Sequence, residues 1–194
     1  MKRILVIIFL VILSSISFIS CSNEKQIKNE SKFGIYLVKE EHKSGALSYG
    51  RNEKGEYIKP ELTLEELLID EMPLITDEDI KKYHWNTHEV ELTKNYFKRH
   101  KIKVSYNANS DNAGSKLLGT KEWDAVVITA KGKRIYCAGF PLSLRRSNFL
   151  PEILIRDVES SFFIDKLGNK SSEDVRNSKY IYEALKEANI LIEK

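Results

Sequence analysis

The chain has 194 residues, of which 42% are hydrophobic and 30% are charged, with 31 Lys and Arg against 28 Asp and Glu. This length suits one domain with a substantial core. The near balance of charge and the aromatic content of 10% exclude a wholly disordered or collagen-like chain, and two cysteines are too few for a disulfide scaffold.

The first twenty residues have the three parts of a secretory signal peptide. Lys2 and Arg3 form a basic start, residues 4–13 are an unbroken apolar run, and a mixed stretch leads to Cys21. A transmembrane helix needs about 20 apolar residues, and four serines dilute residues 14–20. We therefore predict residues 1–20 as a signal peptide.

The ending Phe18-Ile19-Ser20-Cys21 resembles the lipobox of bacterial lipoproteins. In that family the signal is cleaved before the cysteine, and the cysteine thiol is acylated. The resemblance implies that Cys21 carries lipid and anchors the protein to the extracytoplasmic face of a cell membrane. Phe18 departs from the motif, which usually has leucine there, so ordinary secretion and a retained anchor stay open as alternatives.

Cleavage before Cys21 would also remove Lys2 and Arg3 from a chain whose formal net charge is +3, which leaves the mature protein close to neutral. Nucleic-acid binders carry a strong excess of Lys and Arg, so we predict no nucleic-acid partner. Cys137 would have no second cysteine for a disulfide. It lies in an alternating stretch, which predicts a small buried hydrophobe rather than a reactive thiol.

After the cysteine, residues 21–32 are polar and without periodicity, which predicts a flexible tether. A single domain is expected over residues 33–194. Its first strand is predicted at residues 34–38, which are rich in strand formers. Residues 40–59 contain three glycines and are predicted as a long loop or irregular hairpin.

Two helices are predicted from capping boxes, in which a Thr caps the helix and an acid three residues later reaches back to it. Thr63 and Glu66 predict one, with a leucine face and an end at Pro73. The second begins at Thr76 and has Ile80 and Tyr83 on its buried face.

Alternation of apolar and polar residues then predicts a half-exposed strand at residues 88–92, after which Thr93 caps a third helix that extends to about Arg99. A short strand is predicted at residues 102–106. It is followed by a cluster of Asn, Ser, Asp and Gly that favours turns.

The strongest strand pattern is the apolar run at residues 123–130, which the turn Lys131-Gly132 joins to a returning strand at residues 133–140. One more strand is predicted at residues 152–157, and an amphipathic helix at residues 179–190. We therefore expect a single α+β domain with a mainly antiparallel sheet of four or five strands and helices on one face.

Motifs of catalysis and metal binding are weak. His84 and His88 have a spacing that on a helix would direct both imidazoles to one Zn²⁺, but the helix is expected to end before His88. We predict no metal, no cofactor and no catalytic residue. An extracytoplasmic hydrolase remains the alternative, with His84 or His88 paired to Asp79 or Glu89 across the fold.

Charged residues are also segregated along the chain. Residues 61–79 hold eight acids and no Lys or Arg, and a basic cluster follows at residues 94–103. Acids favour helix starts and cations favour helix ends, so solvated helix termini explain both runs more simply than an ion site or a patch for anionic polymers.

A partner-binding surface is predicted on the strand at residues 133–140. Strict alternation would place Arg134, Tyr136 and Phe140 on one face, which continues into Arg145 and Arg146. Tyr, Phe and Arg are typical of protein contacts, so this face is a candidate contact for another envelope protein or a cell-wall ligand. The alternative is that Tyr136 and Phe140 belong to the core.

Three motifs resemble the head subdomain of the SecD periplasmic region and a group of uncharacterised bacterial lipoproteins. They are Pro-Leu-Ile-Thr-x-x-Asp-Ile at residues 73–80, His88-x-Val90-x-Leu92-Thr93, and the strand entry at residues 132–136. The resemblance covers roughly residues 73–157 and implies an α+β layout that acts by contact and movement, without catalytic residues. The chain lacks a transmembrane helix besides the signal, so the export-motor role of SecD is not implied.

Overall fold

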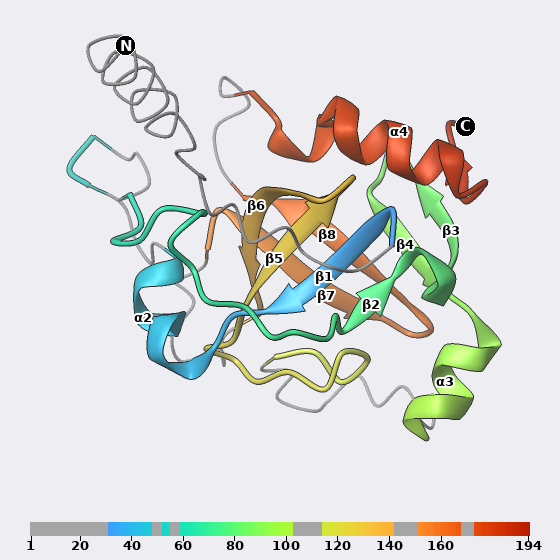
Figure 1. Ribbon diagram of the computed structural model, residues 1–194, viewed down its shortest axis with the longest axis horizontal. Helices are drawn as coiled ribbons and strands as arrows, with labels where there is room; N and C mark the ends of the chain where they lie inside the picture. The colour runs from blue at the N-terminus through green and yellow to red at the C-terminus, as the bar shows by residue number, and fades with distance from the viewer. Residues whose placement is uncertain (1–30, 48–51, 55–58, 103–113, 142–150, 168–172) are drawn as a thin grey trace, which may run out of the picture.

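The computed structural model describes residues 31–47, 52–54, 59–102, 114–141, 151–167 and 173–194 (Figure 1). The predicted signal peptide, Cys21, Arg145 and Arg146 lie outside the described residues. So do all but one residue of the strand predicted at residues 102–106.

A single nine-stranded sheet, curled into a half-barrel, organises the described chain. Its strand order is β2-β1-β5-β6-β7-β8-β4-β3-β9. The strands are β1 (Phe33–Leu37), β2 (Ile75–Thr76), β3 (Ile80–His84), β4 (Glu89–Leu92), β5 (Ala125–Ala130), β6 (Lys133–Gly139), β7 (Ile153–Val158), β8 (Ser161–Lys166) and β9 (Leu191–Ile192).

The helices are few and short. They are α2 (Lys43–Ala46), α3 (Lys94–His100) and α4 (Lys179–Glu187), with 3-10 turns η2 (Glu40–His42), η3 (Asp77–Asp79) and η5 (Val175–Asn177). In Figure 1, α4 runs over the top of the sheet, α2 lies at the left beyond the end of β1, and α3 lies at the lower right.

The prediction of four or five mainly antiparallel strands with helices on one face is wrong. The sheet has nine strands and is mixed, because β6 pairs with β7 and β3 pairs with β9 in parallel. The helices also lie on both faces. Ile181 of α4 packs in the larger core cluster, and Ala46 of α2 packs in the smaller cluster on the other side of β5.

Two cores follow from this arrangement. The inner face, which α4 covers, carries buried side chains from all the long strands, among them Phe33, Ile128 and Phe162. The outer face of β5 carries Ala125 and Val127, which α2 and residues 62–69 cover. Residues 125–130 are buried on both faces, as expected of a central strand.

The second predicted helix is a strand, and a β-bulge explains the error. Ile80 pairs with Leu92 and Lys82 pairs with Glu91, so Lys81 is an extra residue in β3. The bulge turns Ile80 and Tyr83, three residues apart, toward the same core. The capping box exists, since Asp79 Oδ2 accepts from Thr76 N at 3.0 Å, but it closes only the turn η3.

The helix predicted after Thr63 is also absent from the described structure. Its capping box forms, with Glu66 Oε2 accepting from Thr63 N at 2.8 Å, but the chain continues as turns and an isolated bridge between Ile69 and Val38. Strands β8 and β9 were not predicted. The turn between β7 and β8 contains Glu159 with a φ of 52°. Positive φ is uncommon for residues other than glycine, so the sequence does not indicate a turn at this position.

Other local predictions are confirmed. Thr93 Oγ1 accepts from Tyr96 N at 3.2 Å and caps α3. Lys131 and Gly132 form the turn between β5 and β6 with φ values of 52° and 73°, as a type I′ hairpin requires. The apolar stripe of α4 buries Ile181, Ala184 and Leu185.

Candidate functional site

The candidate site lies where β6 and β7 separate. Strand β6 pairs with β5 along its length, but it pairs with β7 only between Gly139 and Leu154. Gly139 leaves room for the side chains of Leu47 and Pro151, because a Cβ there would lie 2.7 Å from Leu47 Cδ1 and 2.8 Å from Pro151 Cγ. Beyond this point, the edge of β6 that faces β7 has no partner strand among the described residues.

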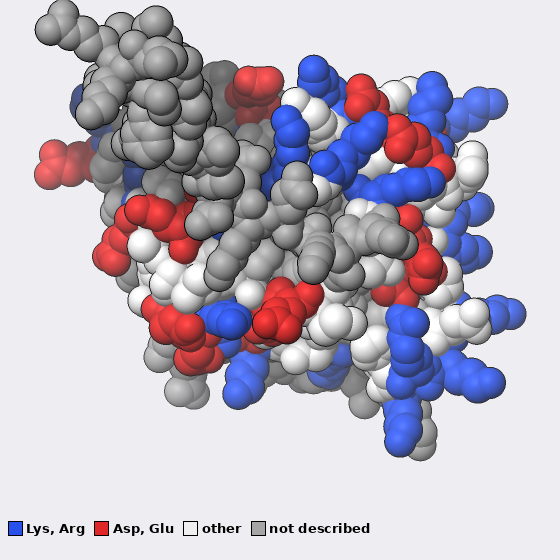
Figure 2. Space-filling model, viewed as in Figure 1, with Lys and Arg blue, Asp and Glu red and all other residues white. Residues whose placement is uncertain are grey.

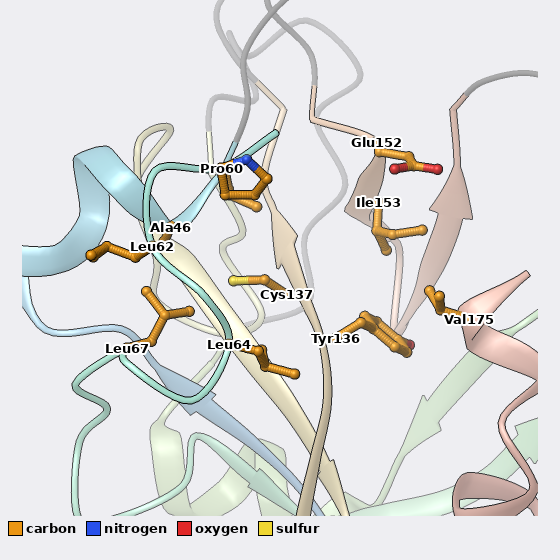
Figure 3. Close-up of a pocket in the computed structure, with 11 residues that line it drawn as sticks. Ala46, Pro60, Leu62, Leu64, Leu67, Tyr136, Cys137, Glu152, Ile153 and Val175 are labelled. Atoms are coloured by element: carbon orange, nitrogen blue, oxygen red, sulfur yellow. The ribbon is translucent and has the colours of Figure 1, made fainter. Parts of the chain in front are cut away.

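A pocket of about 250 Å³ opens at this separation (Figure 3). Ten of its eleven lining residues are uncharged, and Glu152 is the exception. The lining comprises Ala46, Leu47, Pro60, Leu62, Leu64, Leu67, Tyr136, Cys137, Glu152, Ile153 and Val175.

Side chains from both faces of the sheet line this pocket. In Figure 3, Cys137 points to one side of β6, toward Leu64, and Tyr136 points to the other, toward Val175. Adjacent residues of a strand point to opposite faces, so both can border one pocket only at an unpaired edge. The pocket therefore has an outer wall of leucines and an inner wall formed by Tyr136, Ile153 and Val175.

Arg134 holds the outer wall in place. Its guanidinium donates through one nitrogen to the carbonyl oxygens of Leu64 at 2.8 Å, Glu65 at 3.1 Å and Leu67 at 2.7 Å. Burial lowers the pKa of this side chain below its usual range. The segment over β6 is thus fixed by hydrogen bonds to its backbone, which leaves the leucine side chains to line the pocket.

Tyr136 carries an unsatisfied polar atom. The residue is 6% exposed, and its hydroxyl has no hydrogen-bond partner in the described structure. Burial raises its pKa well above 10, and the neighbouring Tyr83 raises it further. A buried hydroxyl without a partner costs about 1–3 kcal/mol, so a ligand group that bonds it would recover part of that cost.

Cys137 is half-buried and lines the pocket, whereas the sequence predicts a buried hydrophobe. Burial raises the pKa of its thiol to about 12, so the thiol stays protonated at neutral pH and is a poor nucleophile. It contributes an apolar surface beside Leu62 and Leu64.

A polar cluster lies behind the inner wall. Arg176 donates from Nε to Asp174 Oδ1 at 2.9 Å and from NH1 to the carbonyl of Ile164 at 2.6 Å. His88 Nδ1 and the Tyr83 hydroxyl are 3.0 Å apart. Burial lowers the pKa of His88 to about 4, and the positive charge of Arg176 adds to that effect.

The residues of the hydrolase alternative do not form a hydrogen-bonded set in the described structure. His84 Nε2 contacts Glu91 Oε1 at 2.8 Å, and His88 contacts Tyr83. Asp79 is bonded to Thr76 and Arg99. Glu89 accepts from the Ser161 hydroxyl at 2.7 Å and lies opposite His84 in the pairing of β3 with β4. No side-chain hydrogen bond in the described structure joins either histidine to Glu89 or Ser161, so the described geometry assembles no triad.

His84 and His88, the two candidate Zn²⁺ ligands, do not lie on one helix. His84 is in β3, and His88 is in the following turn with a φ of 52°. No group of three or more His, Cys, Asp or Glu that could hold a metal occurs in the part of the chain that the structure describes.

The predicted contact surface on β6 is divided between two faces. Thr129 pairs with Arg134 and Ile128 pairs with Tyr136, so Ile135 is an extra residue in a bulge. The bulge places Arg134 on the outer face, and it places Tyr136 and the fully buried Phe140 in the inner core. The expectation that these three side chains share one face is wrong, while the contact with a partner stays a prediction.

Charge is segregated on the surface as the sequence implies. Figure 2 shows acidic side chains over α2 and the segment after it, and basic side chains over α3. Lys94, Lys98 and Arg99 are exposed on α3, and its last turn is basic, which suits the helix dipole.

No helix among the described residues is long and apolar enough to cross a membrane. No family model matches the chain, and no curated protein or solved structure is significantly similar to it. The resemblance to the SecD head therefore stays a prediction.

Proposed function

We propose that the protein is a lipid-anchored extracytoplasmic lipoprotein and a non-catalytic binding or accessory module. Its partner, another envelope protein or a cell-wall ligand, binds at the pocket between β6 and β7. The observation that carries the binding role is an apolar recess with walls from both faces of the sheet, beside a buried Tyr136 hydroxyl that lacks a partner.

The anchor is inferred from the N-terminal pattern of basic start, apolar run and Cys21. The predicted tether, residues 21–32, would span at most about 40 Å when fully extended. Such a tether keeps the domain within reach of membrane proteins and of polymers close to the membrane. A binding module held there would meet its partners at high local concentration.

Acylation is tested by metabolic labelling with an alkyne analogue of palmitate in bacteria that express the full chain. We expect label on the wild type and on Cys137→Ala, which is the matched control because it removes the other cysteine. Cys21→Ser is expected to lose the label and to leave the membrane fraction. Label that persists on Cys21→Ser would show that the proposed anchor is wrong.

Binding at the pocket is tested by placing a photoreactive amino acid at Leu64, which lines the outer wall, in intact cells. Leu68 is the control position, because it lies in the same segment but is 41% exposed and does not line the pocket. We expect adducts of higher mass from position 64 and not from position 68. Equal adducts at both positions, or none at either, would contradict binding at this pocket.

A further inference from the structure

The edge of β6 that faces β7 borders the pocket and, apart from Gly139, pairs with no strand among the described residues. On its other side, β6 pairs with β5 from Lys133 to Gly139, whereas toward β7 the described pairing is confined to Gly139. A strand edge of this kind presents unpaired N–H and C=O groups, which can pair with an added strand. Proteins usually cover such edges, because an exposed edge readily pairs with another chain.

The lining of the pocket matches the side-chain pattern of a strand. An extended segment directs successive side chains to opposite sides. If it lay along β6, one set would meet the outer wall with Leu62 and Leu64, and the other would meet the inner wall with Ile153 and Val175. A rigid flat ligand would fill only one wall. The volume of about 250 Å³ suits a few side chains, since it lies below the range of about 300–1,000 Å³ that is typical for drug-sized ligands.

The charge of the pocket lining indicates which residues would flank the apolar part of a bound segment. Glu152 is the one charged residue in the lining, and it is exposed. No ion pair joins its carboxylate to the described residues, so a cation on the ligand would find it available. A Lys or Arg beside the apolar residues of the bound segment would complement it.

We propose that the free edge of β6 binds an extended segment of a partner protein, which adds to the sheet as a further strand. Its apolar side chains enter the two walls of the pocket alternately, and a flanking Lys or Arg faces Glu152. This inference rests on the proposed binding function and specifies the class of partner.

The test uses the full acylated chain in lipid nanodiscs and a capped peptide of sequence Lys-Thr-Val-Leu-Val-Thr-Lys. Its three central apolar residues supply side chains to both walls. Calorimetric titration, with empty nanodiscs as the blank, should detect binding. Replacing both terminal lysines of the peptide by glutamates should weaken it by about tenfold or more.

Two further peptides keep every side chain but carry N-methyl groups on alternate backbone amides. One peptide is methylated on the odd-numbered amides, and the other is methylated on the even-numbered amides. Strand addition uses the amides on the edge that faces β6, so at least one of these peptides should bind about tenfold more weakly or worse. Equal binding of all three peptides would show recognition by side chains alone and would overturn the proposal.

Protein variants locate the site. Leu64→Asp and Val175→Asp, one in each wall, should each weaken binding of the unmodified peptide by about tenfold or more, and Leu68→Asp should leave it unchanged. Thermal melting of each variant identifies any that fails to fold. If one wall variant fails to fold, binding of the peptide to the other wall variant tests the site. Binding that neither wall variant weakens would place the peptide elsewhere and overturn the proposal.

Failure of this inference differs from failure of the proposed function. If the peptide does not bind at millimolar concentration, strand addition is wrong. Adducts from position 64 in cells would then still support a binding pocket for a different class of partner. If position 64 also gives no specific adduct, the binding function itself is wrong.

Discussion

His88 shows how a single residue can depend on non-local structure. In the sequence, His88 is a candidate only for zinc binding or for the hydrolase alternative. The structure places it in a turn with a φ of 52°, 4% exposed, with Nδ1 3.0 Å from the Tyr83 hydroxyl and its ring against Trp85 at 5.8 Å. Burial lowers its pKa from 6.5 to about 4, so the ring stays neutral in the folded protein near pH 7.

This pKa shift predicts the direction of a pH effect on stability. Between pH 6.5 and about 4 the unfolded chain takes up a proton at His88, whereas the folded protein does not. Stability from the neutral ring is therefore complete above pH 6.5 and is lost as the pH falls to about 4. A shift of this size corresponds to about 3 kcal/mol.

His88→Asn removes the titration and keeps a residue that tolerates a positive φ. Chemical denaturation between pH 7 and pH 4 should therefore show a steeper loss of unfolding free energy in the wild type than in the variant. Parallel curves for the two proteins would mean that His88 is accessible and titrates normally in the folded state.

At the scale of elements, the sequence predicted correctly the turn, the cap and the helix face that depend on interactions between residues close in sequence. The turn Lys131-Gly132, the Thr93 cap and the apolar stripe of α4 each lie within a few residues, and all three are present. The two capping boxes also form, yet each closes a single turn, because a cap does not decide whether a helix continues. After each of these caps the chain instead pairs with another segment, as β3 does with β4 and Ile69 does with Val38.

Two of the errors are due to β-bulges. An extra residue in β3 gave a strand the spacing of a helix, and an extra residue in β6 moved Arg134 to the opposite face from Tyr136. A bulge has no strong signature in a single sequence. The pocket could not be predicted either, because it depends on contacts between distant segments. It forms where β6 and β7 separate, and its outer wall is a leucine segment seventy residues earlier in the chain.

The run at residues 123–130 was the strongest strand prediction, and its burial allows a direct test. Val127 of β5 is 0% exposed in the outer core. Val127→Asp would bury a carboxyl without a partner and should cost about 3 kcal/mol or more. The matched control is Val175→Asp, because Val175 is 41% exposed and a surface change should cost about 0.5 kcal/mol or less. Thermal or urea denaturation measures both, and equal costs would remove Val127 from the core.

At the scale of the molecule, the separation of β6 and β7 divides the sheet into two groups of strands. One group is β2-β1-β5-β6 and the other is β7-β8-β4-β3-β9. In the part of the chain that the structure describes, one residue pair, Gly139 with Leu154, joins the two groups in the sheet, so backbone hydrogen bonding between these residues connects them weakly. The inner core connects them more strongly, because it is one continuous cluster that includes residues of both groups and of α4.

Helix α4 also contacts β1 and β5 of the first group and β9 of the second. We therefore predict that residues 33–194 unfold as one cooperative unit. The free β6 edge then exists inside a stable domain, which lets it stay open for a partner without loosening the two groups of strands.

The two tryptophans of the chain report on the two groups separately. Trp85 follows β3 and lies 5.3 Å from the ring of Tyr182 on α4, whereas Trp123 precedes β5. In Trp85→Phe and in Trp123→Phe, the remaining tryptophan fluorescence and the far-ultraviolet circular dichroism should give the same urea midpoint. The two variants differ in stability, so each comparison is made within one variant. A fluorescence midpoint that departs from the circular dichroism midpoint in either variant would mean that the sheet unfolds in two steps and that the pocket lies at the boundary between two units.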